Sequence, residues 1–107
     1  MLKGGWILVL VTASDKKEAM KIAKKLVENK LATCINIVDN IHSIYWWQGK
    51  VEESNESLLI IKTRIDKLEK LIETIKSLHS YSVPEVIALP IIGGYNKYLE
   101  WLEESIS

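Results

Sequence analysis

The sequence predicts an α+β fold in which two helices cover one face of a four-stranded antiparallel sheet. Two observations support this prediction. Apolar residues follow the order strand, helix, strand, strand, helix, strand, with one further helical segment at the end. The two middle strands are separated only by a short turn. Two βαβ halves joined by a hairpin form a ferredoxin-like split βαβ sandwich, here with a long hairpin and an appended C-terminal helix.

Length, composition and charge narrow the class of protein. The 107 residues suit a single domain spanning residues 1–107, and a hydrophobic content of 48% predicts a folded rather than a disordered chain. Lys+Arg and Asp+Glu balance at 14 each, so we expect no nucleic-acid partner and no anionic membrane partner. Cys34 is the single cysteine, which suits a reducing compartment, and no segment is long enough to span a bilayer. We therefore expect a cytoplasmic protein.

The N-terminal part of the sequence predicts a strand followed by a helix. Trp6 to Thr12 is a nearly continuous apolar run, which predicts a central strand covered on both faces. Asp15 can cap the following helix, and Glu18, three residues later, completes a capping-box pattern. The helix then shows a single apolar stripe, formed by Ala19, Ile22, Ala23, Leu26 and Val27.

The stretch from Leu31 to Arg64 predicts an unusually long hairpin with its turn at Gln48-Gly49. Neither arm contains proline, and Asp39-Asn40 predicts a bulge or a bend rather than a chain reversal. At roughly 3.4 Å per residue each arm could reach about 50 Å. A compact domain of this size has a diameter of roughly 34 Å. The hairpin should therefore extend beyond its own domain.

The second half repeats the pattern of the first. Asp66 and Glu69 form another capping-box pattern before a second helix, which should end near His79. Val86 to Ile92 predicts a fourth strand, and its Pro90 places that strand at an edge of the sheet or at a bulge. Residues 96–106 predict a short final helix.

The hairpin tip predicts self-association. Tyr45, Trp46 and Trp47 are adjacent, so their side chains alternate between the two faces of the strand. An overhanging ribbon with apolar groups on both faces needs a partner to cover it, and the helix-free face of the sheet is also too apolar for water. We expect these three aromatic residues to anchor an oligomer interface. Base stacking on a nucleic acid is the weaker alternative, because glutamates rather than arginines flank them.

Six segments in matching order and spacing resemble one protein family. They are Val9–Thr12, Leu31–Ile37, Ser43–Glu52, Ile61–Thr63, His79–Glu85 and Tyr98–Leu102. Together they resemble the CutA family of divalent-cation tolerance proteins over nearly the whole chain. The resemblance implies a ferredoxin-like subunit, a tight homotrimer, and a link to tolerance of copper and other divalent metals. It also implies an architecture related to the PII signalling proteins, and it implies no established enzymatic activity.

Metal binding is the first functional hypothesis. The candidate ligands are His79, Glu85 and Cys34, followed by His42 and Asp39, because thiolate and imidazole ligands suit copper. None of them forms a close ligand spacing such as CxxC, so folding or subunit assembly must bring them together. We expect copper(II) or another divalent cation, weakly bound. The structural alternatives are a small buried Cys34, a helix-terminal His79 and an exposed His42.

A ligand cleft at a subunit boundary is the second hypothesis. Lys62 follows an apolar run in a core strand, where lysine is rarely buried unless it is paired, and Tyr81 and Glu85 are its expected partners. A PII-like sensor or a trimeric scaffold with clefts for an anionic ligand would use this cluster, with His79 beside it. A structural ion pair at the interface is the equal alternative. No nucleophile–base pair or phosphate-binding loop supports an enzyme, so we predict a non-enzymatic, metal-binding homotrimer.

Overall fold

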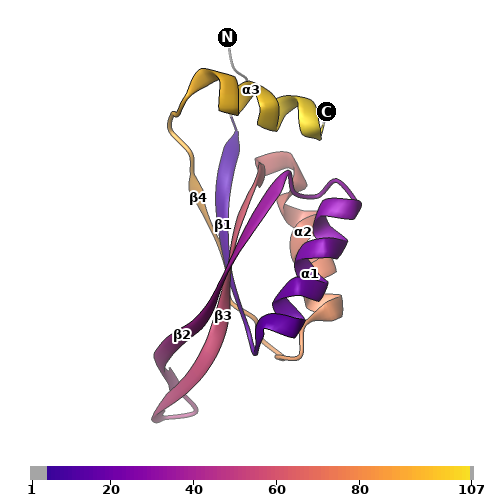
Figure 1. Ribbon diagram of the computed structural model, residues 1–107. Coiled ribbons are helices and arrows are strands. Elements are labelled where there is room, and N and C mark those ends of the chain that lie inside the picture. The colour runs from indigo at the N-terminus through magenta and orange to yellow at the C-terminus, as the bar shows by residue number, and fades with distance from the viewer. Residues whose placement is uncertain (1–4, 107) are drawn as a thin grey trace.

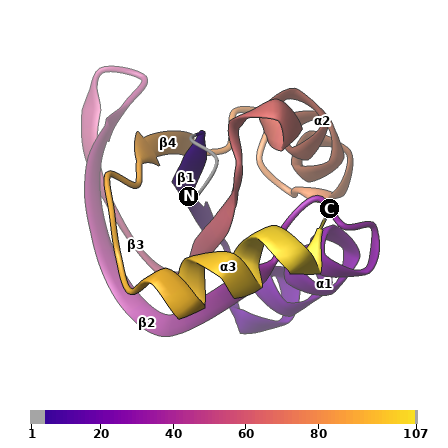
Figure 2. The ribbon, with the colours of Figure 1, turned by 90° about the horizontal axis from the view of Figure 1, so that it is seen from above.

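The structure is a computed structural model that describes residues 5–106, and it confirms the predicted fold class. The sheet is antiparallel with the strand order β2-β3-β1-β4. Helices α1 and α2 lie side by side on one face of it, and α3 crosses the end of the sheet where β1 begins (Figures 1 and 2). The elements are β1 (Trp6–Ala13), α1 (Lys16–Glu28), β2 (Cys34–Trp47), β3 (Lys50–Arg64), the 3-10 turn η1 (Ile65–Lys67), α2 (Leu68–Leu78), β4 (Val86–Pro90) and α3 (Asn96–Ser105).

The main hydrophobic core lies between the sheet and the two helices. Alternate residues of the central strands point to the same face, so Val9 and Val11 of β1 are buried beside Leu59 and Ile61 of β3. The helices supply the opposite wall, chiefly through Ala19, Ile22, Leu26, Leu71 and Ile75. Val27 was expected in the α1 stripe but is 42% exposed, because it lies at the edge of the helix face.

A second, smaller cluster fixes α3 against the sheet. Trp6 is buried with Leu99, Leu102 and Ile106, and its indole Nε1 donates a hydrogen bond of 3.2 Å to Glu103. The final helix predicted from the sequence is therefore confirmed. Its apolar residues cover the open end of the sheet rather than the face under α1 and α2 (Figure 2).

The hairpin of β2 and β3 has the predicted bulge and turn. The pairing register shifts between Val38 and Ile41, and Asn40 has a positive φ of 56°. Gln48 and Gly49 also have positive φ values, of 49° and 77°, as a two-residue type I′ turn requires. The chain measures 48 × 25 × 23 Å, and its hairpin projects beyond both helices (Figure 1). The predicted overhang is thus confirmed.

The sheet face opposite the helices is apolar, as the sequence predicted. Leu8 and Leu10 of β1 are half-buried there, and β3 adds Leu58 and Ile60. On β4, Ile87 is 51% exposed and Leu89 is 44% exposed. We call this surface the open face. The same strand lies at the sheet edge, as its proline predicted, and ends at Pro90 instead of Ile92.

The two expected capping boxes differ in the structure. The Asp15 carboxylate accepts a 2.8 Å hydrogen bond from the Glu18 N–H, so the first cap is confirmed. The Glu18 carboxylate, however, accepts from the N–H of Ser14 and not from that of Asp15. The expected Asp66 cap is wrong: η1 precedes α2, no side chain caps the helix, and Asp66 pairs with Arg64 at 3.2 Å.

The difference between the two aspartates is testable by mutation. Asp15→Ala should lower the free energy of unfolding by about 1 kcal/mol, because it removes an N-cap hydrogen bond. Asp66→Ala is the matched control and should cost less than about 0.5 kcal/mol, because it removes only a surface ion pair. Urea denaturation at one protein concentration measures both losses. Equal losses would contradict the assignment of Asp15 as a cap.

Candidate functional site

A pocket lies between the hairpin and the connection from α2 to β4, residues 79–85. Its volume of about 650 Å³ falls in the range of small-molecule sites. Side chains two residues apart in a strand lie on the same face, so Glu56 is on the same side of β3 as Leu58 and Ile60. The pocket therefore borders the hairpin end of the open face. The lining residues are Thr12, Ser43, Ile44, Tyr45, Trp47, Glu56, Tyr81, Ser82, Val83 and Glu85.

The three aromatic residues of the hairpin tip separate into two groups. Tyr45 and Trp47 line the pocket, and the Tyr45 hydroxyl lies 3.2 Å from the Ser54 hydroxyl. Trp46 is not among the lining residues and pairs across the hairpin with Val51. Trp46 is 74% exposed and Val51 is 58% exposed, so they form an apolar patch on the outer side of the hairpin. The role of Tyr45, Trp46 and Trp47 at a subunit interface remains a prediction.

His79 holds the connection in place through both of its ring nitrogens. Nε2 donates a 2.7 Å hydrogen bond to the carbonyl oxygen of Thr12 in β1, and Nδ1 accepts a 3.0 Å bond from the N–H of Tyr81. The His79 side chain is fully buried. With both nitrogens occupied, the ring has no lone pair free for a metal ion. The structural interpretation of His79 fits its contacts better than the metal-ligand interpretation.

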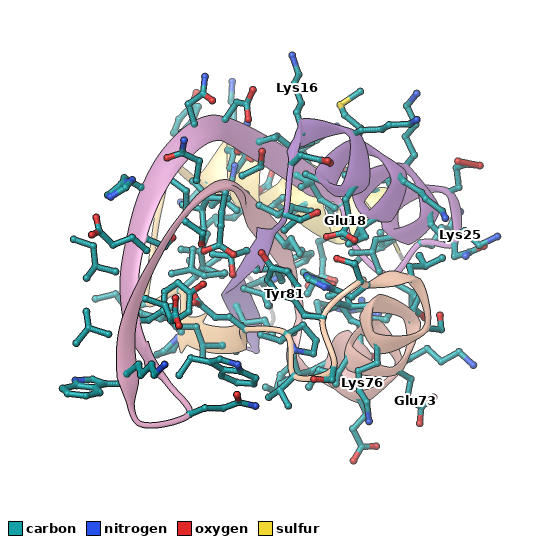
Figure 3. The ribbon with its side chains drawn as sticks, turned by 90° about the horizontal axis from the view of Figure 1, so that it is seen from below. Lys16, Glu18, Lys25, Glu73, Lys76 and Tyr81 are labelled. Carbon is teal, nitrogen blue, oxygen red and sulfur yellow. The ribbon has the colours of Figure 1, made fainter. Side chains whose placement is uncertain are left out.

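Glu18 supports the same connection from α1. One carboxylate oxygen accepts hydrogen bonds from Ser14, and the other accepts a 2.9 Å bond from the N–H of Ser80. Burial alone would raise the pKa of Glu18, but these hydrogen bonds and the nearby His79 ring together lower the pKa below 4.5. Glu18 and Tyr81 point into the space between α1, the connection and the sheet, whereas the labelled lysines and Glu73 project outwards (Figure 3).

Glu56 and Tyr81 form the polar centre of the pocket. The Tyr81 hydroxyl donates a 2.7 Å hydrogen bond to Oε2 of Glu56, whose residue exposure is only 7%. Burial, followed by the hydrogen bond to Glu56, raises the pKa of Tyr81 far above its ordinary value, so the phenol stays protonated. Glu56 was not among the site residues predicted from the sequence. Its position on the pocket side of β3 depends on the register of the hairpin.

Lys62 is not brought to Tyr81 and Glu85 within the subunit. It lies six residues along β3 from Glu56, a separation of about 20 Å in an extended strand. Its Nζ donates a 2.7 Å hydrogen bond to Asn36 and lies 3.8 Å from the Cys34 sulfur. The expectation that Tyr81 and Glu85 pair with Lys62 is therefore wrong for contacts within one chain, because neighbouring positions of β2 supply its partners.

The predicted metal ligands also lie apart. Cys34 is beside Lys62, His79 is bonded within the connection, and Glu85 is exposed at the pocket rim. His42 contacts Glu53 at 2.7 Å on the exposed part of the hairpin, and this contact, followed by one with Asn55, raises its pKa. Asp39 accepts a 2.7 Å hydrogen bond from Ser57. Within residues 5–106 no three His, Cys, Asp or Glu side chains come together to hold a metal ion.

Comparison with known proteins identifies the family. The profile of the CutA1 divalent ion tolerance protein family matches residues 7–105. The chain belongs to the CutA family. The divalent-cation tolerance protein CutA of Thermus thermophilus is 50% identical to this family member over 98 residues, covering 92% of this chain and 95% of the relative. The resemblance stated from the sequence is thereby confirmed.

Solved structures of CutA proteins share the fold. The crystal structure of CutA1 from Oryza sativa has a TM-score of 0.93 at 51% identity, covering 97% of this chain and 95% of that one. The Thermus thermophilus CutA1 structure has a TM-score of 0.92 at 48% identity, covering 95% of this chain and 99% of that one.

CutA relatives differ in length and location. The chain spans 56% and 54% of the length of the chloroplastic CutA proteins of Oryza sativa and Arabidopsis thaliana, each 54% identical to it over 92% of this chain. The solved Archaeoglobus fulgidus CutA is described as periplasmic. In the part of this CutA chain that the structure describes, no helix has the length and apolar character needed to cross a membrane.

The contribution of Glu18 to stability should depend on pH. Its lowered pKa means that the stabilisation is fully present above about pH 4.5 and is lost as the pH falls through the lower pKa of the folded state. Glu18→Gln should therefore destabilise the protein at neutral pH and progressively less in acid. Thermal unfolding across this range measures the difference. A destabilisation that stays constant down to about pH 2 would contradict the ionic role.

Proposed function

We propose that this member of the CutA family is a non-enzymatic divalent-cation tolerance protein that acts as a homotrimer. The observation that supports assembly is the amount of apolar surface that one subunit leaves exposed. The open face presents Ile87 and Leu89, and the outer side of the hairpin presents Trp46 and Val51. Exposed apolar patches of this kind are typical of an interface between proteins.

Closed rotational symmetry suits the geometry of these surfaces. The hairpin of the twisted sheet projects well beyond the helices, so that one subunit can reach a neighbour (Figure 1). A heterologous contact repeated around a three-fold axis closes into a ring in which every copy of the contact is paired. Tyr45, Trp46 and Trp47 are the proposed interface residues, with Trp46 the main anchor because it is 74% exposed.

Copper(II) is the proposed metal, bound weakly at contacts between subunits. Glu85 is exposed and Cys34 is half-buried, so neighbouring chains can complete a coordination sphere that one chain does not hold. His79 would have to give up two hydrogen bonds to take part. We place the protein in the cytoplasm, where its single free thiol would stay reduced.

Oligomeric state is the first test of this proposal. Light scattering at micromolar concentration should give three times the 12.2 kDa mass of the chain. Trp46→Ala should weaken assembly by about 2–4 kcal/mol, the scale of an aromatic hot spot. Val27→Ala, a 42% exposed apolar position on α1, is the control and should leave the mass unchanged. A monomeric wild-type protein would refute the proposed assembly.

Copper titration tests the metal ligands. Cys34→Ser and Glu85→Gln should each weaken copper(II) binding by about tenfold or more, because each removes a proposed ligand. Asp66→Asn, remote from both positions and paired with Arg64, is the control and should bind as the wild type does. Isothermal titration calorimetry gives the affinities. Unchanged affinity in both ligand variants would remove these residues from the site.

A second candidate function is the binding of a small molecule in a cleft between subunits, as in a PII-like sensor or trimeric scaffold. The pocket supports it, because its 650 Å³ exceeds what one metal ion needs and its wall includes aromatic side chains. Its position beside the open face would put a neighbouring subunit next to any ligand. The residues of this cleft are Tyr81, Glu56 and Glu85, and Lys62 would join them only from another chain.

A further inference from the structure

The pocket beside the hairpin has a negative charge that the surrounding side chains do not balance. Its ionisable acidic side chains are Glu56 and Glu85, and its described lining contains neither lysine nor arginine. Lys62, the cation expected there from the sequence, is instead bonded to Asn36. The charge of the lining argues against the anionic ligand that the sequence suggested.

Of the two carboxylates, Glu56 says more about the ligand, because it is buried and Glu85 is exposed. Its only hydrogen-bond partner among residues 5–106 is the neutral hydroxyl of Tyr81, which bonds to Oε2. No lysine, arginine or histidine of the described chain forms an ion pair with it. Buried glutamates are rarely found without a charged partner, because desolvation of a carboxylate is costly. A cation in the pocket would supply the missing partner.

The walls around the carboxylates favour an organic cation over a bare metal ion. Tyr45, Trp47 and Tyr81 place three aromatic rings in the lining, and Val83 adds an apolar side chain. Aromatic faces attract ammonium groups, and they also pack against the hydrocarbon part of a ligand. A hydrated divalent ion requires several close oxygen or nitrogen ligands and gains nothing from such walls.

We propose that this pocket binds a small organic ammonium ion, with its charged group at Glu56 and Glu85 and its apolar body against Trp47. This proposal rests on the second candidate function, small-molecule binding in the cleft, and names the chemical class of the ligand. The Tyr81 phenol orients the Glu56 carboxylate by bonding one oxygen, which leaves the other to accept from the ammonium group.

Three probes of equal length and different charge test the proposal on the full chain. They are hexylammonium, hexanol and hexanoate, each titrated by calorimetry and by the NMR shift of the Trp47 indole N–H. Hexylammonium should bind saturably, at least about tenfold more tightly than the other two, and more weakly at high salt. Hexanoate binding as tightly as hexylammonium, or more tightly, would overturn the proposal.

Charge-removing variants locate the binding. Glu56→Gln keeps an acceptor for the Tyr81 hydroxyl, and Glu85→Gln changes only an exposed side chain. If the buried substitution at Glu56 impaired folding, the exposed one at Glu85 would still test the proposal. Each should weaken hexylammonium binding by about tenfold, the loss of one charge-assisted hydrogen bond. Glu53→Gln, on the same strand but bonded to His42 and absent from the lining, should not. Unchanged affinity in both pocket variants would overturn the assignment.

The outcomes also separate this proposal from the function on which it rests. Saturable binding of hexanol or hexanoate without hexylammonium would keep the small-molecule cleft and refute the ammonium ligand. Saturable binding of none of the three probes would refute both. Copper(II) binding that depends on Cys34 but is unaffected by hexylammonium would show that the metal function is independent of this pocket.

Discussion

The antiparallel ladder between β1 and β3 is the interaction on which the rest of the structure depends. Eight consecutive residue pairs join these strands at the centre of the sheet. Because side chains alternate, one set of residues is buried under α1 and α2 while the other set forms the apolar open face. The strand β3 then continues without interruption from Lys50 to Arg64, so the same ladder also fixes the direction of the hairpin. This ladder therefore positions the core, the open face and the pocket together.

The bulge at Asn40 determines which residues of the hairpin face the pocket. Val38 pairs with Leu58, and after the shift Ile41 rather than Asn40 pairs with Glu56. Without the extra residue in β2, every later side chain of that strand would point to the opposite side. Trp46 would then line the pocket and Trp47 would face outwards. One residue with a positive φ thus separates the aromatic group of the pocket from the exposed apolar patch.

The sequence was sufficient for the fold because its signals are local. Apolar periodicity, the Gln48-Gly49 turn and the Asp39-Asn40 interruption each act within a few residues, and each is confirmed. The site depends instead on contacts between distant segments. His79 bonds to a carbonyl 67 positions away, and Tyr81 bonds to a carboxylate 25 positions away, so no spacing rule could have found either pair. The Asp66 cap was mispredicted for a local reason, because Asp66 lies inside the 3-10 turn η1 and is not the residue that precedes α2.

The connection of residues 79–85 is held from three sides before any ligand arrives. His79 bonds it to β1, Glu18 bonds it to α1, and Tyr81 bonds it to β3. A pocket wall fixed in this way loses little conformational entropy on binding, so more of the interaction energy is available for discrimination between ligands. Because the carboxylate of Glu56 is buried, we expect the pocket to discriminate between ligands by their charge. An anion would be repelled by it and a neutral ligand would leave it unpaired, whereas a cation would compensate the desolvation that folding has already imposed.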